Sequence, residues 1–476
     1  MSVPLALAVN AAANFMIGLM VAKFLGPEDF GRFALALAVG VVIQIACFDW
    51  IRLAAARFGA SARSTLDASF AIFALVAAVL GLDFLLPGLD LPLSRGLLGL
   101  ALFAAVVNGL FDYQQSLVRA RFEDGLYARL LLTKNLFSAV LTVGGAWLTG
   151  SALVAVAGVC AAMAGSLASA HRALRSGVTP GQPPSLRLAL TYLRYAKPVV
   201  AANLLYLVLA LLNRSLIAER HGFAEAGQFS LAFDMGQRIT GSLGVMLEVV
   251  LFQLAVRADG VEGSEGSRLQ VARNMGLVWA LLLPACVGLW LIGPSLERIA
   301  APQAFRGPFE LYFTLLLPGL LCFALGAYAV APVFQIARRT GPLIAAALGA
   351  CAADIALLAV LPPNAASIAI AQTGSMAFGL VCLLLLALAA PARWPSLRDL
   401  VIPLLATGAM AAALFPLRSW EPGLLTLLVQ ILAGIVIYGA IVATFDACGL
   451  RAIALTVLRF RQPRLKSGQQ REAFKE

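Results

Sequence analysis

The stretch VAKFLGPEDFGRFALAL, residues 21–37, places a short charged turn between two long apolar runs. The chain repeats the pattern as IAERHGFAEAGQFSLAF at residues 217–233. Aligned without gaps, the stretches share six residues, whereas about two matches are expected by chance in so Ala- and Leu-rich a window. The shared positions are Ala22, Gly26, Gly31, Phe33, Leu35 and Ala36, which meet Ala218, Gly222, Gly227, Phe229, Leu231 and Ala232. The repetition indicates an internal duplication.

The turn itself has a simple structural purpose. Gly26 and Gly31 are expected to end one helix and let the chain reverse. Glu28 and Asp29 lie near the start of the next helix, where the helix dipole favours acids. Each copy therefore predicts a helical hairpin.

The composition is that of an integral membrane protein. The chain is 61% hydrophobic and 12% charged, whereas an ordinary soluble domain has roughly 25% charged residues. A helix needs about 20 apolar residues to cross the hydrocarbon. Runs of this kind fall at residues 3–24, 33–54, 68–89, 96–117, 131–149, 152–170, 198–217, 229–255, 275–296, 311–334, 343–361, 366–389, 400–416 and 424–446. The predicted fold class is an all-α membrane protein with about 14 transmembrane helices.

The spacing of the two copies predicts how these helices are organised. Six spans separate the copies, so both turns leave the membrane on the same side, as in a parallel repeat. We expect two parallel-repeat six-helix lobes around a central cavity, plus two extra C-terminal helices. The segments are an N-lobe at 1–170, a cytoplasmic linker with an amphipathic helix at 171–197, a C-lobe at 198–389, helices 13 and 14 within 390–446, and a basic cytoplasmic tail at 447–476.

Basic residues predict the orientation. Connections after even-numbered spans, with the C-terminal tail, carry 24 Lys and Arg, and connections after odd-numbered spans carry six. Short basic loops stay in the cytoplasm, so both termini are expected there and both turns outside. The net charge of +11 is then explained by loops that contact anionic membrane lipids. Nucleic acid is not an expected partner, because no folded soluble module with interleaved aromatic residues is present to bind it.

Nothing in the sequence indicates an enzyme. The seven cysteines are scattered without a CxxC pair, and the two histidines lie on opposite predicted sides, so no metal site or disulfide framework is expected. The sequence has neither a phosphate-binding GxxxxGK[ST] loop nor a GxSxG elbow. We expect no cofactor and no catalytic residue. Transport driven by an ion gradient or by the substrate's own gradient fits better.

The two turns also carry a family resemblance. LGPEDFG at residues 25–31, with Asn14 and Lys23 before it, resembles the opening of bacterial polysaccharide flippases, the Wzx-like branch of the multidrug/oligosaccharidyl-lipid/polysaccharide superfamily. Asn213, Arg214 and GQFSLA at residues 227–232 are similar to the family's passage from helix 7 to helix 8. Lys23 stands where many members have Arg, and Asn213 where many have an acid.

The resemblance implies a transport function. Such a protein moves a polyprenyl-diphosphate-linked oligosaccharide from the inner to the outer leaflet of the bacterial cytoplasmic (inner) membrane by alternating access, for exopolysaccharide, capsule or O-antigen biosynthesis. Its implied partners are the lipid-linked oligosaccharide, membrane lipids, and the polysaccharide polymerase and glycosyltransferases of the same pathway.

Three other functions are alternatives to this one. A lipid II flippase also has fourteen helices and differs in substrate. A drug or cation antiporter of the same superfamily usually has twelve. A membrane-embedded glycosyltransferase or polymerase would need a larger outer loop than the dozen or so residues available here.

A diphosphate that crosses the membrane must meet fixed cations and polar groups. Arg238 lies about 14 Å deep in its span, near the middle of a hydrocarbon core about 30 Å thick. It should therefore face a water-filled cavity or pair with Asp234, four residues earlier. Further candidate cations lie near span ends, where the alternative is that they reach out to lipid headgroups. They are Lys23, Arg52, Lys134 and Arg214.

Amides and acids complete the candidate site. Asn10 and Asn14 are one helical turn apart and share a face that lines the cavity or the lobe interface. Asn203 in the seventh span has the same interpretation. The alternative is that these amides only join helices by hydrogen bonds. Asp354 and Asp234 are the candidates for proton or ion coupling; for Asp354 the alternative is a hydrogen-bonded structural acid.

Overall fold

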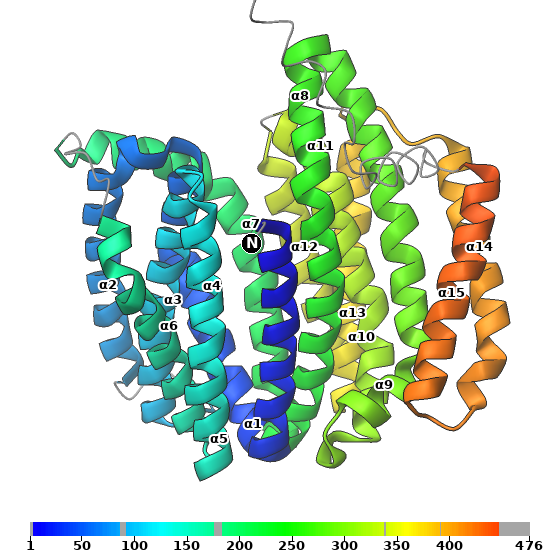
Figure 1. The fold of residues 1–476 in the computed structure, drawn as a ribbon, viewed down its shortest axis with the longest axis horizontal. Helices are drawn as coiled ribbons and strands as arrows, with labels where there is room; N and C mark the ends of the chain where they lie inside the picture. Colours follow the sequence, from blue (N-terminus) through cyan, green and yellow to red (C-terminus); the bar gives the residue numbers. More distant parts are fainter. Residues whose placement is uncertain (1–2, 86–91, 176–182, 338, 391, 447–476) are drawn as a thin grey trace, which may run out of the picture.

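The computed structural model describes residues 3–85, 92–175, 183–337, 339–390 and 392–446, and within these ranges the chain is helical with no strand (Figure 1). The predicted all-α fold class is therefore confirmed. The basic tail at 447–476 and residues 176–182 of the predicted linker lie outside the described residues.

The helices follow one another through short connections. They are α1 (Val3–Phe58), α2 (Arg63–Leu85), α3 (Arg95–Ala120), α4 (Asp124–Phe137), α5 (Gly144–Thr149), α6 (Ala152–Arg175), α7 (Leu186–His221), α8 (Phe223–Leu291), α9 (Gly293–Ala300), α10 (Pro308–Leu325), α11 (Ala331–Ile336), α12 (Gly341–Val360), α13 (Ala365–Leu388), α14 (Leu397–Leu414) and α15 (Leu424–Phe445). Two π-helical turns, η2 (Ser138–Val143) and η4 (Gly326–Val330), join α4 to α5 and α10 to α11.

The number of membrane helices matches the sequence prediction. Eleven segments of the described chain are long and apolar enough to cross a membrane, and the first of them, Val9–Phe58, holds two helices on either side of a break at Gly26. Helix α8 also folds back on itself (Figure 1). Its two arms are in contact, since the Asn274 side-chain amide donates to the Leu251 carbonyl oxygen at 2.7 Å. With α2 and the first arm of α8, the described chain has fourteen long helices, when α4 with α5 and α10 with α11 are each counted as one and the eight-residue α9 is left out.

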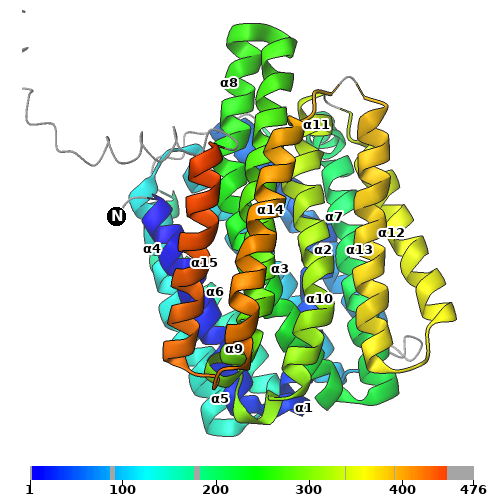
Figure 2. The same cartoon turned by 90° about the vertical axis from the view of Figure 1, so that its right-hand side faces the viewer.

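The helices form two groups. Figure 1 shows α2 to α6 on one side and α8 to α15 on the other, with the first part of α1 and α7 between them. Helices α14 and α15 pack outside α8 and α9 (Figure 2), where the Trp279 indole donates to the Leu400 carbonyl oxygen at 3.1 Å. The lobe boundaries near residues 170 and 198 stay a prediction.

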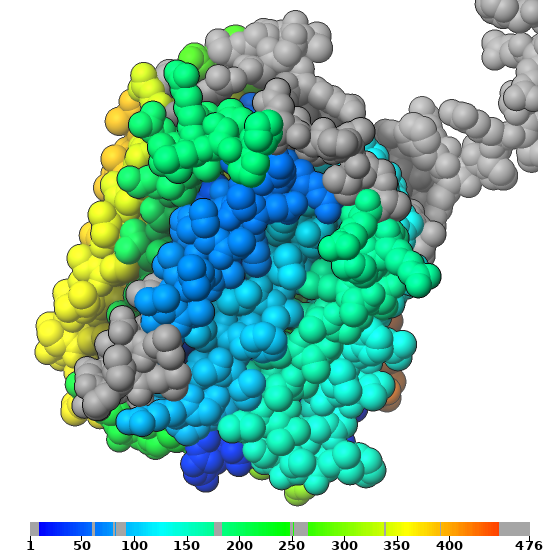
Figure 3. All heavy atoms as spheres, turned by 90° about the vertical axis from the view of Figure 1, so that its left-hand side faces the viewer, coloured from blue at the N-terminus to red at the C-terminus, as the bar shows by residue number. Residues whose placement is uncertain are grey.

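The outer surface of the first group is apolar. Figure 3 shows this side of the molecule. Helix α2 exposes Ile72 and Leu75, and α5 exposes Trp147 and Leu148, each more than half accessible. Side chains of this kind fit contact with lipid acyl chains, since a soluble protein would cover them. The surface thus supports the membrane environment inferred from composition.

The two duplicated turns lie against each other. A Cβ atom on Gly31 would be 2.0 Å from the Phe223 carbonyl oxygen, and a Cβ atom on Gly227 would be 2.0 Å from the Pro27 carbonyl oxygen. The helices after the two turns therefore cross backbone to backbone. Of the two glycines in the first turn, only Gly26 leaves the helical conformation, with φ 70°. The expectation that Gly31 ends a helix is thus wrong: it is the contact point with the other repeat.

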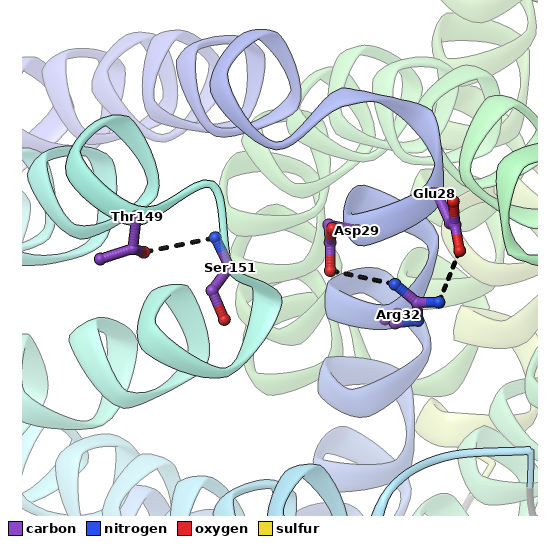
Figure 4. A network of polar contacts seen from close by, with 5 residues as sticks. All are labelled: Glu28, Asp29, Arg32, Thr149 and Ser151. Atoms are coloured by element: carbon purple, nitrogen blue, oxygen red, sulfur yellow. Dashed lines mark hydrogen bonds and ion pairs between the residues drawn. The ribbon is translucent and has the colours of Figure 1, made fainter.

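Charged and aromatic side chains close the same end of the molecule, which we call the turn face. Arg32 donates to Glu28 at 2.5 Å and to Asp29 at 3.3 Å, beside the Thr149–Ser151 turn between α5 and α6 (Figure 4). Its guanidinium also lies 5.1 Å from the centroid of the Phe223 ring of the second repeat. The two repeats are therefore joined at the turn face.

Candidate functional site

A cavity of about 990 Å³ lies between the two groups of helices and extends toward the face opposite the turns, here called the terminal face. Its walls come from α1, α7, α10 to α13 and η4. Three arginines line it: Arg52 and Arg57 from the second part of α1 and Arg194 from the first turns of α7. None of the described residues that line it is an acid. Such a cavity offers fixed positive charge to an anion.

The three arginines differ in how they are held. Arg52 is partly buried and donates through Nε to Asp49 at 2.5 Å. Arg57 and Arg194 are exposed. The Arg57 guanidinium lies 5.4 Å from the centroid of the Tyr195 ring, an arrangement that holds a cation by its attraction to the ring face. The exposed pair can therefore turn toward a ligand while Arg52 stays in place.

A second cationic cluster lies where the first part of α1 contacts α4 and α8. The Lys134 ammonium donates to the Asn14 side-chain oxygen at 3.2 Å, and Arg238 donates to the Asn14 main-chain oxygen. Gly18 makes room for the guanidinium, because a Cβ atom there would be 3.2 Å from its Nη1 atom. Neither cation has a carboxylate within ion-pair distance among the described residues.

This cluster modifies the expectation for Arg238. Arg238 does not line the large cavity and does not pair with Asp234; it is exposed and rests on the backbone of α1. Lys134 does not reach out to headgroups but lies within electrostatic range of Arg238 and of Asp112 on α3. Asp112 in turn accepts from the Gln44 amide at 2.7 Å.

Asp234 has a partner on another helix. It forms an ion pair with Arg214 of α7, whose side chain is 8% exposed. The Arg214 guanidinium also lies 5.0 Å from the centroid of the Phe233 ring. Arg214 is therefore not a headgroup contact, and it joins α7 to α8 behind the turn face.

The predicted coupling acid Asp354 is buried in a neutral polar cluster. The Asn213 amide donates to Asp354 at 3.2 Å and to the Gln372 side-chain oxygen at 3.3 Å. Asp354 is 4% exposed and is not paired with a cation among the described residues. The cluster joins α7, α12 and α13 and does not line the cavity.

The remaining predicted residues are separated from one another. Asn203 is exposed and lines the cavity. Asn10 lies on α1 with its side-chain oxygen buried and without a hydrogen-bond partner among the described residues. Lys23 is exposed near the turn face, 5.9 Å from the centroid of the Phe24 ring. Of the nine predicted site residues, the cavity brings together Arg52 and Asn203.

Sequence reasoning missed Arg57, Arg194 and Tyr206 as cavity residues. The first two were counted only as loop charges, since their place in the cavity depends on how α1 meets α7. Tyr206 had a usable signal, because it lies three residues after Asn203 and so on the same face of a helix.

These features define a class: an all-helical membrane protein with two groups of helices around a cationic cavity. No protein-family model and no curated protein matches the chain. Solved structures match it in fold. The fold is similar to that of the lipid II flippase MurJ in an inward closed conformation, with a TM-score of 0.64 and 12% identity over 95% of this chain and 99% of that one.

Multidrug transporters are also similar. An inward-facing MATE family transporter of the MOP superfamily gives a TM-score of 0.53 and 14% identity over 82% of this chain and 94% of that one. A Vibrio cholerae MATE transporter gives a TM-score of 0.54 and 11% identity over 81% of this chain and 95% of that one. At these identities the likeness concerns the fold.

Proposed function

We propose that the chain moves a polyprenyl-diphosphate-linked oligosaccharide across the bacterial cytoplasmic membrane by alternating access. The observation that carries the proposal is the cavity of about 990 Å³, whose lining, as far as the structure describes it, has three arginines and no acid. A diphosphate diester carries two negative charges, and guanidinium groups bind phosphate oxygens through two parallel hydrogen bonds. The volume is at the upper end of the roughly 300–1,000 Å³ typical of ligand sites.

The charge of the cavity weighs against a drug or cation antiporter. A cationic drug would be repelled by Arg57 and Arg194, since the only cavity arginine with an acid partner among the described residues is Arg52, which pairs with Asp49. Lipid II flipping is the second candidate, because the likeness to MurJ extends over 95% of the chain. Lipid II is itself a lipid diphosphate, so both candidates use the cavity's positive charge.

The basic loops and the closed turn face support one orientation in the membrane. We place the terminal face and both termini in the cytoplasm, so that the cavity loads substrate from the inner leaflet while the crossed turns block the outer side. The polysaccharide polymerase and glycosyltransferases of the pathway would then act on opposite sides of the membrane.

The other candidate residues take places along the path to the outside. We assign a second cationic site on this path to Lys134 and Arg238, which both contact Asn14. Arg214 and Lys23 lie closer to that face. Asp354 and Asp234 remain the candidates for proton or ion coupling, since each is an acid held inside the helical bundle.

Ligand binding by purified protein in detergent tests the proposal. The probes are a polyprenyl diphosphate and the lipophilic cation tetraphenylphosphonium. We expect the diphosphate to bind and the cation not to. The double variant Arg57→Gln/Arg194→Gln, which leaves the Asp49–Arg52 pair intact, should weaken diphosphate binding about tenfold or more, because charge-assisted hydrogen bonds contribute about 1.5–3 kcal/mol each.

The matched control is Arg129→Gln. Arg129 is an exposed arginine of α4 that lies outside the cavity and donates to the Ser169 carbonyl oxygen at 2.9 Å. This control should bind like the parent protein. Tighter binding of the cation than of the diphosphate, or a double variant that behaves like the control, would overturn the proposal.

A further inference from the structure

The walls of the cavity are chemically unequal. All three cations, Arg52, Arg57 and Arg194, lie on α1 and the first turns of α7, which we call the cationic wall. Among the residues that the structure describes, those lining the cavity from residue 198 onward, on α7, α10, η4, α11, α12 and α13, include no charged side chain. This second surface, the neutral wall, carries amide and tyrosine side chains: Asn203, Tyr206, Tyr328 and Gln335.

The aromatic rings of the neutral wall are held in fixed positions. Tyr206 packs edge to face against Phe323 with ring centroids 5.2 Å apart. Its hydroxyl fits against α13 only because position 379 is glycine, where a Cβ atom would lie 2.6 Å from that oxygen. The Tyr328 ring lies on Gly244, where a Cβ atom would be 2.0 Å from the ring.

The backbone also departs from a regular helix at this wall. The π-helical turn η4 presents Gly326, Ala327 and Tyr328, three consecutive residues, to the cavity. Single π-helical turns inside α-helices are frequent at functional sites, because the extra residue redirects side chains. Asn203 from α7 is exposed toward the same space.

We infer that the neutral wall, with Asn203, Tyr206, Tyr328 and Gln335, is a binding site for the sugar units next to the diphosphate. Sugars are uncharged and carry many hydroxyl groups. Amide groups can donate to and accept from those hydroxyls, and fixed tyrosine rings offer flat apolar surfaces to the sugar's C–H groups. A lipid tail could use neither the amides nor the hydroxyls. The inference rests on the proposed function, since it assumes that the diphosphate binds the cationic wall.

Two lipids that differ only in sugar test the inference. The probes are a polyprenyl diphosphate and the same lipid carrying an N-acetylglucosamine disaccharide, each titrated into the purified protein. The variant Asn203→Ala/Gln335→Ala should weaken binding of the sugar-bearing lipid about tenfold, as expected for the loss of two neutral hydrogen bonds. Binding of the bare diphosphate should change less than about twofold. The variant Arg57→Gln/Arg194→Gln should weaken both lipids equally.

A second variant tests the same site without removing a polar group. Gly379→Ala should displace the Tyr206 hydroxyl and weaken only the sugar-bearing lipid, whereas Gly408→Ala on α14, where a Cβ atom meets nothing within 4 Å, should change neither. The sugar site is wrong, and the proposed function stands, if the parent protein binds both lipids equally. The same holds if the Asn203→Ala/Gln335→Ala variant weakens binding of both lipids equally or of neither lipid. If the parent protein binds neither lipid, the proposed function itself fails.

Discussion

The contact between the two turns predicts that one added methyl group opens the turn face. In Gly227→Ala the new Cβ atom would lie 2.0 Å from the Pro27 carbonyl oxygen, whereas ordinary contact begins at 3.4 Å. The two helices must therefore separate by about 1.4 Å, and overpacking of this kind costs about 1–3 kcal/mol. Only the state with the turns in contact bears that cost. The population of states with the turns apart should rise by about 5- to 150-fold.

The distance between two spin labels measures this shift. Labels on cysteines at Glu28 and Ala224, both exposed beside the contact, report the separation of the turns once the native cysteines are replaced. The parent protein should give one short distance, and Gly227→Ala should add or favour a longer one.

The matched control is Gly241→Ala on the same helix, where a Cβ atom meets nothing within 4 Å. This control should keep the parent distance. If Gly227→Ala and Gly241→Ala give the same distance distribution, the crossed glycines do not hold the turn face closed.

Three further predictions concern charged residues of the candidate site. Arg238→Ala should abolish transport at normal protein abundance. Arg238→Lys should impair it, because lysine cannot form the bidentate hydrogen bonds of a guanidinium to phosphate oxygens. Normal transport by Arg238→Ala would refute a binding role. The Asp354→Asn variant should fold normally, since the new amide oxygen still accepts from Asn213. Its transport should be insensitive to a pH gradient imposed across proteoliposomes. Continued sensitivity would show that Asp354 has a structural role. Arg214→Ala should lower the free energy of unfolding by about 2–3 kcal/mol, less than a fully buried pair because Asp234 is part exposed, and an unchanged Tm would contradict this.

The fold was predictable because its main signals are local. Apolar runs mark the spans, and the repeat at residues 21–37 and 217–233 marks the two hairpins. What Gly31 does was not predictable from its own neighbourhood. Its partner, Phe223, is far away in sequence, and a glycine that permits a close crossing looks the same as a glycine that ends a helix.

The site was less predictable for the same reason. The ion pair between Asp49 and Arg52 is of a kind that spacing can predict, since the two residues lie three apart on one helix. Spacing alone also suggested Arg238 as the partner of Asp234, yet Arg214, which lies 20 residues away in sequence, forms that ion pair across two helices. A pairing between helices depends on which faces meet, and one sequence does not contain that information.

Transport of a lipid diphosphate in proteoliposomes tests the central claim most directly. The substrate is a polyprenyl-diphosphate-linked disaccharide with a fluorophore on the sugar, quenched by a reductant that cannot cross the membrane. The account predicts that vesicles with the parent protein lose fluorescence beyond the outer-leaflet half, and that vesicles with Arg57→Gln/Arg194→Gln stop at that half. Equal quenching in vesicles with the parent protein, with the variant and with no protein would contradict it.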